Sequence, residues 1–416
     1  MLMRGFLMKF LKKIQGVLIY SMMGFSVFAK APLNLNQTNY EKILEESIVS
    51  KGNNYRLKTV IEKMKKGQKV WVAALGGSVT EGAGPANFTD GYAYQFFRAL
   101  KDNFTPDEGK NFNFNNAGLS GTSSILGLVR YDSDVTEICG RSPDLLIIEF
   151  AVNDDGSEST QIAFEGIVRK VLLANPETAI IALYSAADYG NTMAQKKPVA
   201  DYYSIPQVNM LKSVKESIDK KLFTHDEYFT DNVHPTLEGH QLVTACLINL
   251  INTIDKDKKD SAIKVPEKIF KTPGFNNFIR ILGDDDNVRI VKGGFKDTDS
   301  QTQSLKKTNK GNFPINWYKQ ATNENEPFVL NINCKNFIFT YKVQGSWLTE
   351  KYGEADIYVD GKLFKTVDGG AKNGWNNCEN LILINEKTSA NHKIEVKMAK
   401  GSEDKGFTIV AMGYSK

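Results

Sequence analysis

The chain has 416 residues, 41% of them apolar, and no low-complexity tract, which predicts a folded protein with room for two domains. Of its 52 basic residues, four (Arg4, Lys9, Lys12 and Lys13) precede Lys30, and without them 48 basic residues balance 48 acidic ones. This neutral balance lacks a concentrated basic block, so we expect no nucleic-acid partner.

The N-terminal segment 1–29 has the composition of a signal peptide. Basic residues precede an apolar run from Val17 to Phe28, and Val27 and Ala29 stand at the −3 and −1 positions of a signal-peptidase site. We expect cleavage after Ala29 and a secreted or periplasmic mature protein. The alternative is an uncleaved anchor, for which the apolar run is short because a membrane span needs about 20 residues. No stable membrane span is expected after cleavage.

Residues 30–258 are predicted to form an α/β domain. Its strands are continuous apolar runs rather than alternating ones, and a helix follows each of them, which indicates a parallel sheet covered on both faces. Right-handed crossovers then give a three-layer α/β/α sandwich. Strands are predicted at 69–75, 112–117, 143–150 and 178–184, and helices at 91–104, 123–136, 158–173, 208–220 and 236–254.

A charged segment over 259–274 is predicted to be a linker, and residues 275–416 to be an all-β sandwich of about seven short strands. Asp360-Gly361 lies between two of these runs and predicts a two-residue hairpin. Trp347 and Trp375 fall in this second domain. Packing in a core or at a domain interface is the favoured role for both, and stacking on a sugar ring is the alternative.

The four cysteines match no zinc-binding spacing. Cys246 lies in an apolar helical segment and is predicted to be a buried free thiol. Cys334 with Cys378 is the better candidate for a disulfide in an exported protein. We expect no metal and no organic cofactor.

Three short polar blocks follow the predicted strands. Ser78 sits in the block Gly76–Gly82, where a serine at a glycine-flanked turn can expose its hydroxyl and aim its own N–H at an oxyanion. Gly121, in Asn116–Thr122, can bring a backbone N–H close to a ligand. Asn153 can donate its amide to an oxyanion, or it can cap the next helix. Each block taken alone also fits an ordinary turn or loop.

A fourth block, Asp231–Pro235, precedes the last helix. Asp231 stands three residues before His234, so its carboxylate can reach one imidazole nitrogen and fix the tautomer, leaving the other nitrogen free to accept a proton from a serine. The other nearby histidines form no metal site, and His240 is expected on the surface of the last helix. The four blocks together, in this order, form the main functional signal.

The order Ser, Gly, Asn and Asp-x-x-His over residues 69–254 resembles the SGNH (GDSL-type) hydrolases, which have a flavodoxin-like α/β fold. The resemblance implies that Ser78 is the nucleophile, His234 the base and Asp231 its orienting carboxylate. It implies an oxyanion hole formed by the N–H groups of Ser78 and Gly121 and by the Asn153 amide. The chain departs from the family pattern at Gly77, where the family has Asp, and at Ala151, where it has Gly.

The resemblance implies hydrolysis of an ester through an acyl-serine intermediate. Exported relatives with an added β-sandwich often deacetylate polysaccharides, so an O-acetylated glycan is the expected substrate, with another small ester as an alternative. The segment 185–205 leaves the strand 178–184 at the active-site edge, and its candidate substrate contacts are Asp188, Tyr189, Tyr202 and Tyr203. Two alternatives stay open: an acyltransferase that uses the same triad, and a non-catalytic glycan-binding module.

Overall fold

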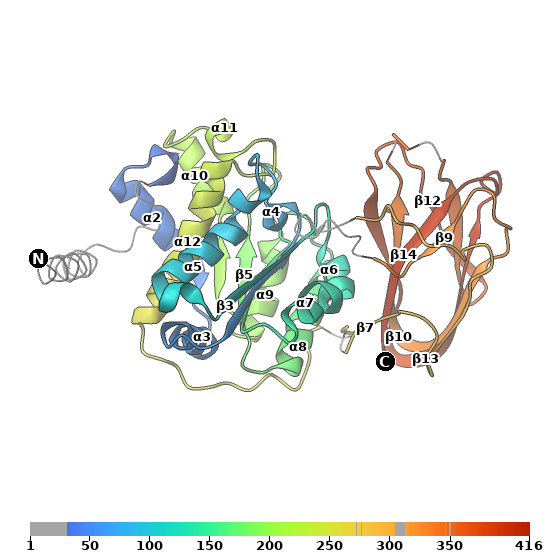
Figure 1. The fold of residues 1–416 in the computed structure, drawn as a ribbon, viewed down its shortest axis with the longest axis horizontal. Coiled ribbons are helices and arrows are strands. Elements are labelled where there is room, and N and C mark those ends of the chain that lie inside the picture. Colours follow the sequence, from blue (N-terminus) through green and yellow to red (C-terminus); the bar gives the residue numbers. More distant parts are fainter. Residues whose placement is uncertain (1–30, 272, 276, 304–312, 346, 349–350) are drawn as a thin grey trace, which may run out of the picture.

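The computed structural model describes residues 31–416 except 272, 276, 304–312, 346 and 349–350. The predicted signal peptide, 1–29, therefore lies outside the described residues. The part that is described has an α/β domain followed by an antiparallel β-domain (Figure 1). Within it, no helix combines the length and the apolar character that a membrane crossing requires.

The α/β domain is built on a six-stranded sheet with the strand order β1-β6-β5-β4-β2-β3. Its strands are β1 (Ile48–Ser50), β2 (Val70–Gly76), β3 (Phe112–Gly118), β4 (Leu145–Glu149), β5 (Ala179–Tyr184) and β6 (Gln207–Asn209). Strands β2 to β6 are parallel, and their order is that of the flavodoxin-like doubly wound fold. The predicted fold class is thus confirmed.

Two features of the sheet differ from the sequence prediction. Strand β1 pairs antiparallel with β6, so the sheet is mixed rather than wholly parallel. Strand β6 also occupies residues where the start of a helix was predicted, and that helix begins at Leu211 instead. Both strands have three residues, which is too short for a periodic signal to separate a strand from a helix.

Helices cover both faces of this sheet (Figure 1). They are α2 (Gln37–Ser47), α3 (Tyr55–Lys65), α4 (Ser78–Glu81), α5 (Tyr92–Phe104), α6 (Ser124–Tyr131), α7 (Glu137–Cys139), α8 (Glu158–Ala174), α9 (Met193–Tyr202), α10 (Leu211–Asp219), α11 (His225–Tyr228) and α12 (Leu237–Lys256). Short 3₁₀ helices are η1 (Pro32–Asn34), η2 (Phe88–Asp90) and η3 (Asp107–Gly109), and η4 (Asp132–Thr136) is a short π-helix. The predicted helices correspond to α5, α6, α8, α10 and α12.

The β-domain contains β7 (Ile279–Arg280), β8 (Val288–Val291), β9 (Trp317–Lys319), β10 (Phe328–Val343), β11 (Glu354–Val359), β12 (Lys362–Asp368), β13 (Asn377–Met398) and β14 (Phe407–Ser415). All of their pairings are antiparallel. Asp360 and Gly361, both with positive φ, form the predicted hairpin between β11 and β12. Strands β10 and β13, with 16 and 22 residues, are longer than the short strands that the sequence predicted.

All four cysteines are buried free thiols, so the prediction of a Cys334–Cys378 disulfide is wrong. The reason is the register of β10 with β13, in which Cys378 lies opposite Lys342 and Cys334 lies opposite Ala390. Eight residues of strand separate the two levels, roughly 26 Å at ~3.3 Å per residue. A disulfide requires Cα atoms within about 7 Å. The prediction for Cys246 is confirmed.

One apolar cluster extends from the α/β domain into the β-domain. This cluster includes Leu75, Leu146 and Ile148, on the face of the sheet that α6, α8 and α9 cover. It continues into Phe275 and Phe278, which follow α12 in the sequence. Helix α6 also contacts β7, β10 and β14 directly. The layer formed by α6 and α8 is therefore buried on two sides, and the β-domain completes the packing of the α/β domain.

We expect Phe275→Ala to destabilise the whole protein. Phe275 is 1% exposed and lies against Gly166 of α8, so its removal leaves a cavity between the domains. Such truncations cost about 3–5 kcal/mol. Denaturant unfolding measures the loss.

Phe364→Ala is the matched control, because Phe364 on β12 is 46% exposed. A surface truncation of this kind changes stability by about 0.5 kcal/mol or less. Equal effects of the two variants would contradict a shared core.

Candidate active site

Ser78 lies on a tight turn between β2 and α4. It is the first residue of α4, so its N–H precedes the first intrahelical hydrogen bond, from Glu81 N to Gly77 O (3.0 Å). Gly76 allows the turn to close, because a Cβ there would lie 2.1 Å from Thr80 Oγ1. The serine hydroxyl is consequently held at the carboxyl end of β2, beside the point where the strand order reverses.

His234 reaches this serine from the loop before α12. Its Nε2 lies 2.8 Å from Ser78 Oγ, and its Nδ1 lies 2.6 Å from Asp231 Oδ2. The second oxygen of Asp231 accepts the backbone N–H groups of Val233 and His234, both at 2.8 Å. The carboxylate thus fixes both its own loop and the imidazole ring. With Nδ1–H donated to Asp231, the lone pair of Nε2 faces the serine hydroxyl.

The ionisation of Asp231 suits this arrangement. Partial burial would raise its pKa, but the hydrogen bonds from His234 and Val233 outweigh that effect and hold the pKa of the carboxyl below its usual value. Asp231 therefore stays negatively charged next to the imidazole at neutral pH. A fixed negative charge here stabilises an imidazolium that forms when His234 accepts a proton.

Gly121 and Asn153 flank the serine on the loops after β3 and β4. Gly121 has φ +66°, a backbone conformation that favours glycine. The Asn153 amide packs on the glycine before the nucleophile: its Oδ1 lies 2.0 Å from the place that a Cβ on Gly77 would take. Any side chain at position 77 would displace Asn153. The departure from the family pattern at Gly77 therefore has a steric reason.

A buried arginine contacts the ends of the two strands from which the Ser78 and Gly121 loops leave. Arg130 on α6 is 0% exposed and donates to Gly76 O (2.8 Å) at the end of β2 and to Ala117 O (2.7 Å) in β3. Its charge is balanced by Asp134, at 2.9 Å. The two strand ends that lead to Ser78 and Gly121 are thereby tied to one side chain.

Two further buried groups hold the serine turn. Thr80 donates to Glu149 at the end of β4 (3.0 Å) and lies 2.8 Å from the Tyr92 hydroxyl. His240 is 0% exposed, so the prediction that it lies on the surface of the last helix is wrong. Its Nδ1 accepts the Tyr92 N–H (3.1 Å) and its Nε2 donates to Ala83 O (3.0 Å), while burial lowers its pKa to about 4.

The four predicted substrate contacts separate into two places. Tyr189 donates its hydroxyl to Val152 O (3.0 Å), next to Asn153, and is 63% exposed. Asp188 lies beside the catalytic loop, with its N–H on Asn232 O (2.9 Å) and its carboxylate on His225. These two residues are at the edge of the site.

Tyr202 and Tyr203 are elsewhere, and their prediction as substrate contacts is wrong. Tyr203 is 1% exposed, and its hydroxyl donates to Glu165 (2.6 Å) in the core. The Tyr202 hydroxyl donates to Lys268 O (3.0 Å) of the linker. Helix α9, which sequence analysis did not predict, turns the end of this segment away from the site.

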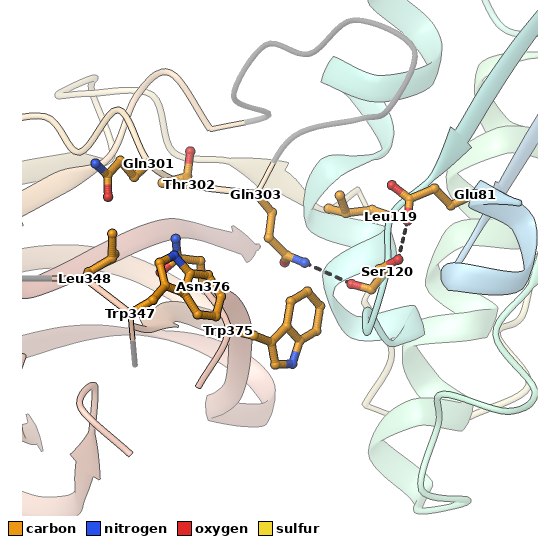
Figure 2. Close-up of a pocket in the computed structure, with 10 residues that line it drawn as sticks. All are labelled: Glu81, Leu119, Ser120, Gln301, Thr302, Gln303, Trp347, Leu348, Trp375 and Asn376. Carbon is orange, nitrogen blue, oxygen red and sulfur yellow. Dashed lines mark hydrogen bonds between the residues drawn. The ribbon is translucent and has the colours of Figure 1, made fainter. Parts of the chain in front are cut away.

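A cleft of about 450 Å³ opens beside the serine turn, between the two domains (Figure 2). The β-domain side presents Trp347 and Trp375, which are 65% and 41% exposed, so neither packs in a core, whereas their place where the two domains meet agrees with the domain-interface part of the prediction. The Trp375 ring lies 2.7 Å from the place of a Cβ on Gly121. Gln303 donates to Ser120 O (3.0 Å), and Ser120 donates to Glu81 of α4. We call this the interdomain cleft.

The comparisons with known proteins agree with this geometry. Residues 74–242 match the model of the GDSL-like lipase/acylhydrolase family. This part of the chain is a GDSL-like lipase/acylhydrolase domain. It contains Ser78, Gly121, Asn153, Asp231 and His234, and no curated protein sequence gives a significant match to the chain.

The two-domain arrangement has close structural counterparts. Two solved structures of a two-domain esterase (CEX) active on acetylated mannans, one co-crystallised with mannopentaose, match with TM-scores of 0.76 and 0.75. Their sequence identities are 23% and 25%; both matches cover 90% of this chain, and they cover 98% and 99% of those chains. The GDSL-like domain and the β-domain thus occur together in another esterase.

Sequence reasoning missed several residues that shape the GDSL-like site: Arg130, Glu149, Glu81 and Gln303. Arg130 and Glu149 carried a usable signal, because each is a charged residue within or next to an otherwise apolar run. Glu81 and Gln303 carried none, since their roles depend on contacts across the chain. Among the residues that the structure describes, no group of three His, Cys, Asp or Glu side chains is placed to hold a metal ion.

We expect Glu149 to make stability fall as the pH rises. Its carboxyl is 0% exposed, and burial raises its pKa from 4.5 to about 7. Between these values the unfolded chain releases a proton that the folded protein retains, so folding becomes less favourable as the pH rises through this window. Glu149→Gln removes the effect. The free energy of unfolding of this variant, relative to that of the wild type, should therefore rise by on the order of 3 kcal/mol from pH 4 to pH 8.

Denaturant unfolding across this pH range measures the difference. Glu267→Gln, on the exposed linker, is the control and should follow the wild type at every pH. A stability difference between Glu149→Gln and the wild type that does not change with pH would contradict a buried, protonated carboxyl.

Proposed function

We propose that this protein is an exported serine esterase that removes O-acetyl groups from a polysaccharide, with an acetylated mannan as the first candidate. One observation carries the proposal: Ser78, which is hydrogen-bonded to the His234–Asp231 pair, begins helix α4, and the last residue of this helix, Glu81, lines a cleft that the β-domain lines with indole and amide side chains. The 25% identical esterase active on acetylated mannans, which matches over both domains, supports this choice of substrate.

In the proposed reaction His234 Nε2 takes the proton of Ser78 as Oγ attacks the acetyl carbonyl carbon. The oxyanion that forms is stabilised by the N–H groups of Ser78 and Gly121 and by the Asn153 amide. The C–O bond to the sugar then breaks, and the imidazolium of His234 returns its proton to the departing sugar hydroxyl. Water, deprotonated by the same imidazole, attacks the acetyl-serine and releases acetate.

The chemistry of the interdomain cleft favours a neutral sugar chain. Glu81 is the one charged residue among the ten described residues that line it, and Ser120 donates a hydrogen bond to it. The remaining polar side chains, such as Gln303 and Asn376, are amides and hydroxyls, which can both donate to and accept from sugar hydroxyls. Trp347 and Trp375 add flat apolar surface for the sugar faces.

Ser78→Ala should abolish acetate release, by a factor of at least about 10⁴, because no other group can form the acyl intermediate. The measurement compares release from 4-nitrophenyl acetate and from acetylated mannan. Ser261→Ala on the exposed linker is the control and should behave as the wild type.

The melting temperature of Ser78→Ala should stay close to that of the wild type. Release by Ser78→Ala at the wild-type rate would contradict the nucleophile. No release by the wild type from either substrate, but acetyl transfer to an added oligosaccharide, would favour the acyltransferase.

Trp347→Ala should weaken the binding of acetylated mannan but not the hydrolysis of a small ester. Trp347 lines the cleft from the β-domain and its ring folds back on Gly345, away from the catalytic groups. We therefore expect KM for acetylated mannan to rise about tenfold, the loss of one stacked aromatic contact, with kcat/KM for 4-nitrophenyl acetate unchanged. Phe364→Ala, at an exposed position on β12, is the control. An equal loss on both substrates would argue against a glycan site at this position.

A further inference from the structure

A second cavity in the β-domain adjoins the interdomain cleft. It has a volume of about 310 Å³, and Gln301 and Leu348 line both spaces. Its floor is formed by buried side chains, Lys342 and Tyr352 among them, and its rim by exposed ones, including Gln320. We call it the β-domain cavity. None of the residues assigned to the ester chemistry lines it.

The floor of the cavity contains a buried lysine, Lys342, whose ammonium group has more N–H donors than its protein partner accepts. The Lys342 side chain is 1% exposed, pairs with Asp299, and lies with its ammonium 4.7 Å from the centre of the Tyr352 ring. An ammonium group has three N–H donors, and within the described part of the chain Asp299 is its one acceptor. Buried donors are normally satisfied, so the remaining ones need acceptors inside the cavity.

Asp299 itself is fully engaged. Its carboxylate accepts from the Tyr352 hydroxyl (3.0 Å), from Thr408 Oγ1 (2.8 Å) and from the Gln301 N–H (2.7 Å). Burial would raise its pKa, but Lys342 and these hydrogen bonds outweigh burial and hold the pKa of the carboxyl below its usual value. The carboxylate therefore cancels the charge of Lys342, and the floor is neutral overall.

Because the floor is neutral overall, we expect the cavity to bind a neutral ligand rather than an anionic one. A carboxylate or phosphate group next to Lys342 would also lie close to the buried Asp299, where like charges repel strongly. A sugar hydroxyl meets no such penalty: it can accept from Lys342 and donate to the side-chain oxygen of Gln320. Tyr318 and Tyr352, stacked at 5.9 Å, supply an aromatic wall. The volume is at the lower end of ligand pockets, ~300–1,000 Å³.

We propose that the β-domain cavity binds one neutral hexose unit that branches from the glycan whose main chain lies in the interdomain cleft. The identity of that main chain rests on the proposed function, whereas hexose binding by the cavity requires no ester hydrolysis. The two lining residues shared with the cleft place the branch next to the main chain. The cavity is thus a specificity site for decorated polymer.

The test is calorimetric binding to full-length Ser78→Ala, which cannot turn over substrate. The probes are linear mannopentaose and the same oligosaccharide with one galactosyl branch. We expect the branched probe to bind about tenfold more tightly. Equal or weaker binding of the branched probe overturns the proposal, and so does tighter binding of a probe branched with glucuronic acid.

A rim variant locates the effect. Gln320→Trp, combined with Ser78→Ala, fills the mouth of the cavity at an exposed position, so folding is preserved and Lys342 keeps its partner. It should reduce the affinity for the branched probe to that for the linear one and leave the linear affinity unchanged. Gln68→Trp, also at an exposed position but remote from the cavity, should change neither. Retention of the branch preference in Gln320→Trp overturns the assignment.

A second readout separates this inference from the proposed function. If mannopentaose does not bind, the proposed main chain is wrong, and saturation-transfer NMR with D-galactose, D-mannose and D-glucose then tests the cavity alone. Saturation transfer in the wild type that disappears in Gln320→Trp supports a hexose site. Its absence with all three sugars overturns it.

Discussion

The guanidinium of Arg130 is the contact on which the arrangement of the site depends. It binds carbonyl oxygens at the carboxyl ends of β2 and β3, and a buried aspartate balances its charge. The serine turn and the Gly121 loop leave the sheet from these two ends. A buried ion pair of this kind is costly to break, because one partner is then left unpaired in the interior. The loops are thus spaced by a rigid and buried connection.

The second domain is part of the same structural unit. The apolar cluster between the sheet and α6, α8 and α9 runs on into Phe275 and Phe278, and Trp375 of the β-domain lies on the Gly121 loop. Ser78, His234 and Asp231 come from one domain, while the tryptophan side chains of the neighbouring cleft come from the other. The interdomain cleft is therefore a space that neither domain forms alone.

The sequence predicted those parts of the molecule that depend on local order. Continuous apolar strands and following helices gave the layers, and Asp231 with His234 could be paired because they lie within one turn of chain. The joining of Ser78 to His234 needed the fold, since 156 residues separate them. Strands of three residues, such as β6, were missed because they are too short to carry a period.

Long-range placement explains the remaining errors. The disulfide prediction failed because strand register, which spacing does not reveal, separates the two thiols. Tyr203 and His240 were expected to be accessible, but both are buried by helices that pack on them from elsewhere in the chain. Trp347 and Trp375 lie where the two domains meet, as one part of their prediction had it, but they line an open cleft there rather than a core, where large aromatic residues mostly lie.

The contact between Gly77 and Asn153 has a consequence for the history of this lineage. Because the amide occupies the space of any side chain at position 77, a return to the aspartate of the family pattern requires the Asn153 side chain to take another position. The two positions are therefore expected to be coupled: homologues that retain glycine at 77 should share this placement of the asparagine amide, and those with aspartate should place the amide differently.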